Sequence, residues 1–248
     1  MTTTPATYLY AITADDAALP HDLAGLGDAR VGVVCHDGLC AVVGPVDAER
    51  PVGRRADVLA HGRVLDALVQ HGGPVIPVRF GAVFEDEAQV VEAVLAPQAE
   101  QLVEVLEGLR DRSQFTLRAQ YDEAVVLAEV VGENDDIAAL RAATRERPED
   151  ETYPARVRLG ELVGRAMEYK RESDGNVVLD ALAPRAVATQ VLPGAGLDHV
   201  IEAAFLVDHA LVPQFEQAAE DVAASFAPRA KVALVGPVAP YDFVPKEG

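Results

Sequence analysis

The order of strands and helices in the second half of this sequence constrains its fold more than any other feature. Strand-like runs at 114–121, 185–193, 199–208 and 230–237 alternate with helical stretches. These are one or two helices at 122–146 with a break near "GEND", a long helix at about 154–182 in which a break at "SDGN" stays open, and a helix at 211–226. This βαββαβ order is typical of the split-βαβ, ferredoxin-like arrangement, an antiparallel sheet with helices on one face. We therefore expect a ferredoxin-like domain with helical insertions at 113–248, ending in an extended C-terminal tail.

The first half contains similar elements in a different order. The sequence predicts a strand at 7–13, a hairpin with strands near 31–36 and 39–43, a helix at 56–71, a strand at 74–84, and an acidic helix that begins at Glu85 and restarts at Pro97. The polar stretch "GLRDRS" then separates this region from the next strand. We expect an N-terminal α+β domain at 1–112, and thus an α+β protein of two domains.

The charge of the chain excludes several kinds of partner. Acidic residues outnumber basic ones by 40 to 21, giving a formal net charge of −19. Nucleic acids and anionic membrane surfaces both attract basic proteins, so neither is an expected partner. The sequence has no apolar run of membrane-spanning length, and its N-terminus lacks the pattern of a secretory signal. We expect a cytoplasmic protein without membrane insertion.

The two cysteines flank a strong turn signal in "VCHDGLC". Asp37-Gly38 is typical of a two-residue hairpin, which sets Cys35 opposite Cys40, close enough for a disulfide. Because the cytoplasm is reducing, we expect two buried thiols instead. A metal site would need His36 as well, but alternation along a strand points that side chain to the opposite face.

Arg79 interrupts the apolar stretch "PVIPVRFGAVF". Alternation predicts that Val75, Pro77 and Arg79 share one face of a strand, whereas Ile76, Val78 and Phe80 fill the core. Three interpretations of the guanidinium remain open: a structural ion pair with one of the many acids, a contact to a partner protein, and a catalytic cation.

No motif for catalysis or cofactor binding is present. The chain lacks a nucleophile elbow, a P-loop and a dinucleotide-binding fingerprint, and no two histidines have H-E-x-x-H spacing. The acidic clusters lie at expected helix starts or in loops, where they complement the helix dipole or face solvent. We expect no enzyme activity, no cofactor and no metal.

Two motifs, at 77–81 and near the C-terminus, resemble those of the gas vesicle protein GvpL/GvpF family. The first is P-V-R-F-G and the second G-P-x-x-P-Y-x-F, and the family-motif positions in this chain are Pro77, Arg79, Phe80, Gly81, Gly236, Pro237, Pro240, Tyr241 and Phe243. The stretch "EAAFLVDHALVPQFEQ" adds to the resemblance, which spans nearly the whole chain. The family commonly has Trp-Pro after Gly-Pro, where this chain has Val238 and Ala239.

The resemblance implies a function that the residues alone do not. It implies a non-enzymatic gas vesicle accessory or minor structural protein, with two α+β domains of which the second is ferredoxin-like. The implied partners are the small, hydrophobic shell protein GvpA and other gas vesicle accessory proteins, and the implied role is to support gas vesicle assembly. An alternative from another class is a small-molecule-sensing regulatory protein built on a ferredoxin-like domain.

Overall fold

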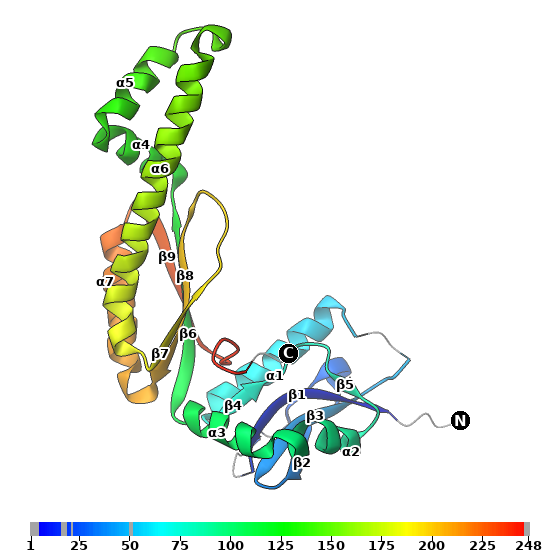
Figure 1. The fold of residues 1–248 in the computed structure, drawn as a ribbon. Coiled ribbons are helices and arrows are strands. Elements are labelled where there is room, and N and C mark those ends of the chain that lie inside the picture. Colours follow the sequence, from blue (N-terminus) through cyan, green and yellow to red (C-terminus); the bar gives the residue numbers. More distant parts are fainter. Residues whose placement is uncertain (1–4, 16–18, 21, 50–51, 246–248) are drawn as a thin grey trace. The chain divides into compact units, whose positions relative to one another are not determined.

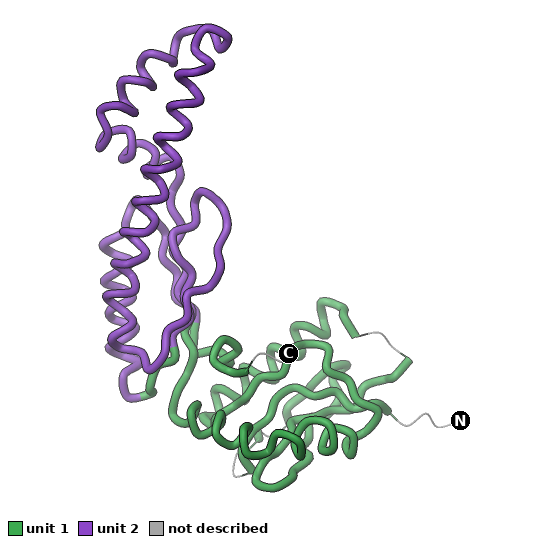
Figure 2. The backbone as a smooth tube through the Cα atoms, in the orientation of Figure 1, with its two compact units in different colours: residues 1–115, 206–209, 236–248 green, residues 116–205, 210–235 purple. Residues whose placement is uncertain are grey.

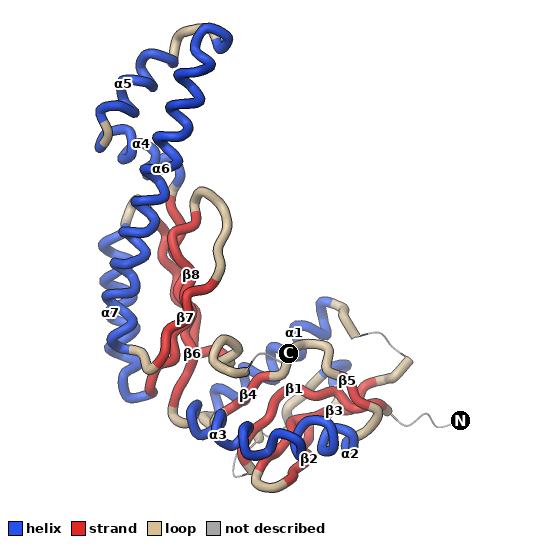
Figure 3. Tube along the Cα trace, viewed as in Figure 1, coloured by secondary structure: helices blue, strands red, loops and turns tan. Residues whose placement is uncertain are grey.

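A computed structural model of the chain describes residues 5–15, 19–20, 22–49 and 52–245. The chain divides into two compact units (Figure 2). Unit 1 comprises Met1–Phe115, Leu206–His209 and Gly236–Gly248, and unit 2 comprises Thr116–Phe205 and Ala210–Val235. Both contain helices and strands, which agrees with the expected α+β class (Figure 3). The domain division expected after residue 112 stays a prediction.

Unit 1 is built on an antiparallel sheet. Its strands are β1 (Ala6–Ala14), β2 (Gly32–His36), β3 (Leu39–Val46), β4 (Val75–Pro77) and β5 (Val83–Phe84). The order is β2-β3-β1-β4, and β5 also pairs with β1 (Figure 1). The strand predicted at 7–13 and the hairpin predicted at 31–43 are confirmed.

Helices follow β3 and β5 in unit 1. They are α1 (Arg55–His71), α2 (Glu87–Val90), a π-helical turn at Val91–Leu95, a 3-10 turn at Ala96–Gln98, and α3 (Ala99–Leu109). Gly72 ends α1 in a left-handed conformation with φ of 91°, as expected from the glycine pair after this helix. The change of helical type around Pro97 confirms the predicted restart there.

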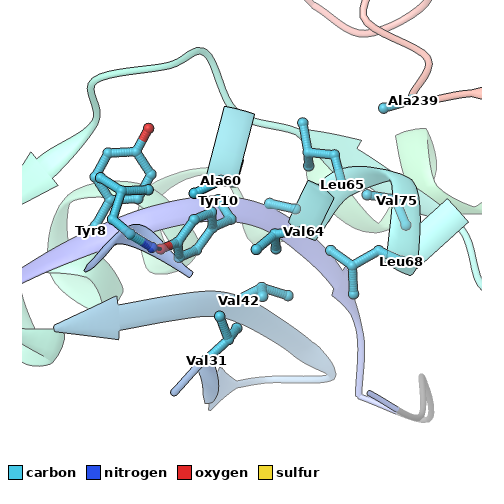
Figure 4. Close-up of a cluster of buried hydrophobic side chains, with 12 residues drawn as sticks. Tyr8, Tyr10, Val31, Val42, Ala60, Val64, Leu65, Leu68, Val75 and Ala239 are labelled. Atoms are coloured by element: carbon cyan, nitrogen blue, oxygen red, sulfur yellow. Dashed lines mark hydrogen bonds between the residues drawn. The ribbon is translucent and has the colours of Figure 1, made fainter. Parts of the chain in front are cut away.

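A β-bulge in β1 helps to assemble the core of unit 1. The register with β3 shifts between Leu9 and Ala11, so Tyr10 is the extra residue. As a result Tyr8, Tyr10 and Ala11 all belong to one buried cluster. Figure 4 shows residues of this cluster, which combines the two tyrosines of β1 with side chains of α1, namely Ala60, Val64, Leu65 and Leu68.

The hairpin contains a disulfide, so the expectation of two buried thiols is wrong. Asp37 and Gly38 both have positive φ, 46° and 82°, as a tight hairpin turn requires. This turn pairs Cys35 with Cys40 at a Cα–Cα distance of 4.0 Å, and their sulfurs are bonded. Cys40 is buried, whereas Cys35 is exposed. The direct pairing of Cys35 with Cys40 across the hairpin brings the two sulfurs within bonding distance. The argument from the reducing cytoplasm, which had favoured free thiols, did not predict this bond.

The face alternation predicted around β4 is also wrong in part. The strand ends at Pro77, and Val75, Ile76, Pro77 and Val78 are all buried. Val75 belongs to the cluster packed on α1, although it was expected on the opposite face from the core. The reason is that α1 and α3 both contact β4, so neither face of this strand is open to solvent.

The second sheet is formed by β6 (Arg112–Tyr121), β7 (Ala188–Leu192), β8 (His199–Asp208) and β9 (Ala230–Val238), in the order β7-β8-β6-β9. Helices α6 (Glu149–Leu182) and α7 (Val212–Phe226) pack against each other beside it, and the shorter α4 (Glu123–Glu133) and α5 (Asp135–Thr144) pack on α6 (Figure 1). These elements confirm the predicted strands and helices.

Helix α6 continues without interruption through "SDGN", where a break was considered. Asp174 and Gly175 of this stretch are buried within the helix. Gly175 packs against the side chain of Ile201 in β8, from which a Cβ on Gly175 would lie at an ordinary contact distance of 3.8 Å. Packing on the sheet therefore outweighs the low helix propensity of these residues.

The C-terminal tail was expected to be extended, but it turns back on itself. The amide of Tyr241 donates to the carbonyl of Ala239 at 2.9 Å, and the amide of Phe243 donates to the carbonyl of Pro240 at 3.1 Å. Side-chain anchors in unit 1, described below, hold this folded shape. Among the described residues, no helix combines the length and apolar character needed to span a membrane.

Candidate functional site

The two family-like motifs meet in unit 1. The loop after β4 carries Phe80 and Gly81, and the C-terminal tail carries Tyr241. Both contact the same two buried side chains, Tyr8 of β1 and His61 of α1. Neither Tyr8 nor His61 was singled out as a site residue from the sequence. The only sequence signal for His61 is its place in the apolar helix at 56–71.

A directed chain of hydrogen bonds joins the motifs. The Gly81 amide donates to Tyr8 Oη at 3.0 Å, and Tyr8 Oη lies 3.0 Å from His61 Nδ1. His61 Nε2 lies 3.0 Å from Tyr241 Oη, which donates to the carbonyl of Val78 at 3.3 Å. An amide can only donate and a carbonyl can only accept, so both ends fix the direction of the chain. The chain requires a neutral His61 with its proton on Nε2.

Burial keeps this chain uncharged. It lowers the pKa of His61, against the opposing effect of the Val78 backbone. Burial also raises the pKa of Tyr8 and that of Tyr241, each to about 12. All three side chains are therefore neutral near pH 7, in the protonation states that the hydrogen bonds require.

Aromatic rings enclose His61. Tyr10 stacks on the imidazole with ring centroids 5.8 Å apart, and Phe80 meets it edge-on at 5.6 Å. Phe80 also packs against Tyr8 at 6.2 Å. The motif phenylalanine therefore fixes the loop after β4 onto the core of unit 1.

Gly81 has a conformation that suits glycine alone. Its φ is 105°, in the left-handed region, and a Cβ placed on it would meet nothing within 4 Å. The requirement for glycine is therefore set by the backbone and not by space. This conformation aims the Gly81 amide at Tyr8.

The tail motif is anchored at three further points. Gly236 lies so close to Phe115 that a Cβ would fall 2.4 Å from its ring. Buried Gln114 receives a hydrogen bond from the Asp242 amide at 3.1 Å and donates to the Asp242 carboxylate at 2.7 Å. Pro240 is buried, and Phe243 is partly buried. Pro237, by contrast, is exposed in β9.

An open cavity of about 510 Å³ lies beside these motifs in unit 1. Its lining includes Pro77 and Arg79 of the first motif and Tyr241 of the second. Most of the remaining lining is apolar and comes from β1, β4, the helical region before and within α3, and the tail: Ile12, Ile76, Val78, Ala93, Val94, Gln98, Gln101, Leu102, Val105, Val244 and Pro245. The structure thus brings together motif residues that lie more than half the chain apart.

Among the described residues of this lining, Arg79 is the one with a charged side chain. It is exposed, and within the described part of the chain no carboxylate lies within 4.0 Å of its guanidinium. The structural ion pair considered from the sequence is therefore not found among the described residues. The guanidinium therefore lines a mostly apolar cavity and pairs with no acidic side chain among the described residues.

The other described residues do not form the pattern of a metal site. In the ranges that the structure describes, no three His, Cys, Asp or Glu side chains are grouped so as to hold a metal ion. Ser113 is buried in β6, and its hydroxyl lies 2.9 Å from His209 Nε2.

Comparison with known proteins places this architecture in a family. The family model for gas vesicle synthesis protein GvpL/GvpF matches residues 6–245. Gas vesicle protein F of Streptomyces sp. (strain CB03234) is 33% identical over 246 residues, which cover 96% of this chain and 99% of the relative. Gas vesicle protein F of Nostoc sp. (strain PCC 7120) is 25% identical, with 95% and 96% covered.

A solved structure shares the fold. The crystal structure of GvpF from Anabaena sp. PCC7120 superposes with a TM-score of 0.87 at 24% identity, covering 99% of this chain and 100% of that one. The fold and the sequence matches define the class, a gas vesicle protein that is not a member of a known enzyme family. The chain belongs to the GvpL/GvpF family.

Proposed function

We propose that this protein binds the hydrophobic shell protein GvpA, together with other gas vesicle accessory proteins, and supports gas vesicle assembly. The word "synthesis" in the family description supports a role in making the vesicle. The observation that carries the proposal is the convergence of both family-like motifs on one open, mostly apolar cavity in unit 1. A shell subunit with exposed apolar surface would aggregate unless an acidic partner held it.

The motif residues divide into two proposed roles. Phe80, Gly81, Gly236 and Pro240 shape the walls of the site, because each is fixed by packing or backbone conformation. Pro77, Arg79 and Tyr241 line the cavity and face the partner. Pro237 and Phe243 complete the tail motif, which we propose belongs to the same partner-binding region.

Co-expression with the shell protein tests the proposed function. Affinity capture of the tagged full chain is expected to recover GvpA, and deletion of the gene is expected to abolish or deform gas vesicles. Recovery of no shell protein, together with normal vesicles in the deletion strain, would refute it. Fluorescent labelling of the complementing protein would check the expected location at gas vesicles in the cytoplasm.

We also propose that the second half of the chain is a ferredoxin-like domain, with the domain division near residue 112. The strand order β7-β8-β6-β9 and the two helices α6 and α7 beside the sheet support this arrangement. Helices α4 and α5, with the long N-terminal part of α6, would then be the helical insertion. Expression of 113–235 alone, followed by circular dichroism and a thermal melt, would test whether this part folds independently.

A second candidate function is small-molecule sensing, which a cavity in unit 2 favours. The cavity measures about 1020 Å³ and is lined by residues of α4, α5 and α6, including Arg165 and Lys170. Lys170, however, already pairs with Glu129 and Glu133, each at 3.1 Å. Isothermal titration of the full chain against a panel of anionic metabolites would decide, since sensing requires saturable heat from at least one of them.

A further inference from the structure

The cavity in unit 1 has walls and a mouth of different character. Ile12, Ile76 and Val78 lie at its base and are buried, whereas Ala93, Gln98 and Gln101 are exposed on the helical side. The cavity is therefore an open groove and not a closed chamber. Its size falls within the range of clefts that take a sizeable ligand or several side chains of a partner. A bound partner must be apolar where it contacts the sheet and polar where it contacts the side-chain amides of Gln98 and Gln101.

The charge of the groove favours a partner that carries a carboxylate. Although the chain carries a formal net charge of −19, the single charged residue among the described residues of the lining is the cation Arg79. Covering this guanidinium with a purely apolar partner would desolvate a charge that pairs with no described acid, which is strongly unfavourable. A guest with a carboxylate next to its apolar face removes this penalty, because the planar guanidinium binds carboxylates through two parallel hydrogen bonds.

The hydroxyl of Tyr241, which also lines the groove, is not available to a bound partner in the same way. The Tyr241 hydroxyl accepts a hydrogen bond from His61 Nε2 and donates one to the carbonyl of Val78. Its ring therefore forms a fixed wall, and among the described lining residues Arg79 is the charged donor, beside the neutral amides of Gln98 and Gln101. Apolar side chains of β1, β4, α3 and the tail all contribute to this open lining. An open apolar surface made by several elements favours a segment of a protein chain over a compact small molecule.

We infer that this groove is the docking site for an amphipathic segment of the shell protein, in which an Asp or Glu beside the apolar face pairs with Arg79. The inference rests on the proposed function and adds the surface, the type of segment and the residue that selects it. It also accounts for Arg79 in an apolar stretch, since its partner would be supplied from outside the chain.

Two measurements on the full chain co-expressed with the shell protein test this inference. In the first, a photo-crosslinking amino acid replaces Leu102 in the groove, and a matched variant carries it at Val58, an exposed apolar position on α1 outside the groove. We expect a crosslink to the shell protein from position 102 and none from position 58. A crosslink from position 58 alone would overturn the inference.

In the second, Arg79→Gln removes the charge, and Arg55→Gln serves as the control at an exposed arginine of α1 that does not line the groove. We expect Arg79→Gln to weaken capture of the shell protein at least about tenfold, and Arg55→Gln to leave it within about twofold. A thermal melt checks that both variants fold, as expected for exposed positions. Arg79→Glu should bind more weakly still, and replacing the matching acid of the shell protein by lysine should restore its binding.

The outcomes separate the inference from the function on which it rests. If the unmodified chain captures no shell protein, the proposed function fails, and the inference fails with it. If it captures the shell protein but Arg79→Gln binds as tightly as Arg55→Gln, the function stands and the inference is overturned. A carboxylate-bearing small molecule found by mass spectrometry in the purified protein, lost in Arg79→Gln with shell capture unchanged, would also overturn it.

Discussion

Replacing Tyr8 by phenylalanine removes one hydroxyl from the middle of the buried hydrogen-bond chain. Tyr8 is 0% exposed. The change leaves two groups without their partner, the Gly81 amide and His61 Nδ1. The orphaned nitrogen of buried His61 costs about 1–3 kcal/mol, and the Gly81 amide adds up to about 1 kcal/mol, because Gly81 is exposed and water can reach it. The expected total is about 1–4 kcal/mol, compared with a typical domain stability of about 5–15 kcal/mol.

Urea denaturation monitored by circular dichroism gives the measurement. The transition midpoint should move to lower urea, with the slope nearly unchanged. Tyr169→Phe is the matched control, because Tyr169 is 76% exposed on α6 and should change stability by less than about 0.5 kcal/mol. If Tyr8→Phe is no more destabilising than Tyr169→Phe, the hydrogen-bond chain does not stabilise unit 1, and the role assigned to Gly81 and His61 is refuted.

Three further predictions concern unit 1. Gly81→Ala should destabilise by about 1–2 kcal/mol in the same urea assay, because φ of 105° is strained for any residue with a Cβ; no loss would contradict the backbone argument. Burial depresses the pKa of His61 below its unfolded value, so the unfolded state binds more protons on acidification, and stability should be constant above about pH 6.5 and fall below it. His61→Gln should reduce that slope in a pH series of melts, and an unchanged slope would exclude His61 as its source. Reduction of the Cys35–Cys40 disulfide, which spans a sequence separation of 5, should lower stability by at most about 2 kcal/mol, since short loops gain least; a melt with and without dithiothreitol measures it.

Local chemistry in the sequence predicted most of the elements of this protein. Asp37-Gly38 specified a tight hairpin, Gly72 ended α1, and Pro97 divided the helical region after β5. These features depend on the φ that one residue prefers or on a missing amide hydrogen. Such preferences act within a few residues, so they can be read without knowing the rest of the fold.

The sequence also located the two motifs of the candidate site, but not what they do. Gly81 and Tyr241 were noted only through a resemblance, and nothing in the order of residues placed them near each other. Tyr8 and His61, which connect them, carry no local signature. Long-range contacts of this kind depend on how α1 packs on β1, and a single sequence does not state that packing.

Tertiary structure decided the points on which sequence reasoning failed. Val75 is buried because α1 and α3 both contact β4, so alternation did not predict its face. The tail bends because Gln114, distant in sequence, holds Asp242. The surroundings of Arg79 also depended on the fold. The sequence alone determined that an arginine stands in an apolar stretch. The fold decided that its side chain lines a groove in which no described residue is acidic, because only packing determines which side chains surround a charge.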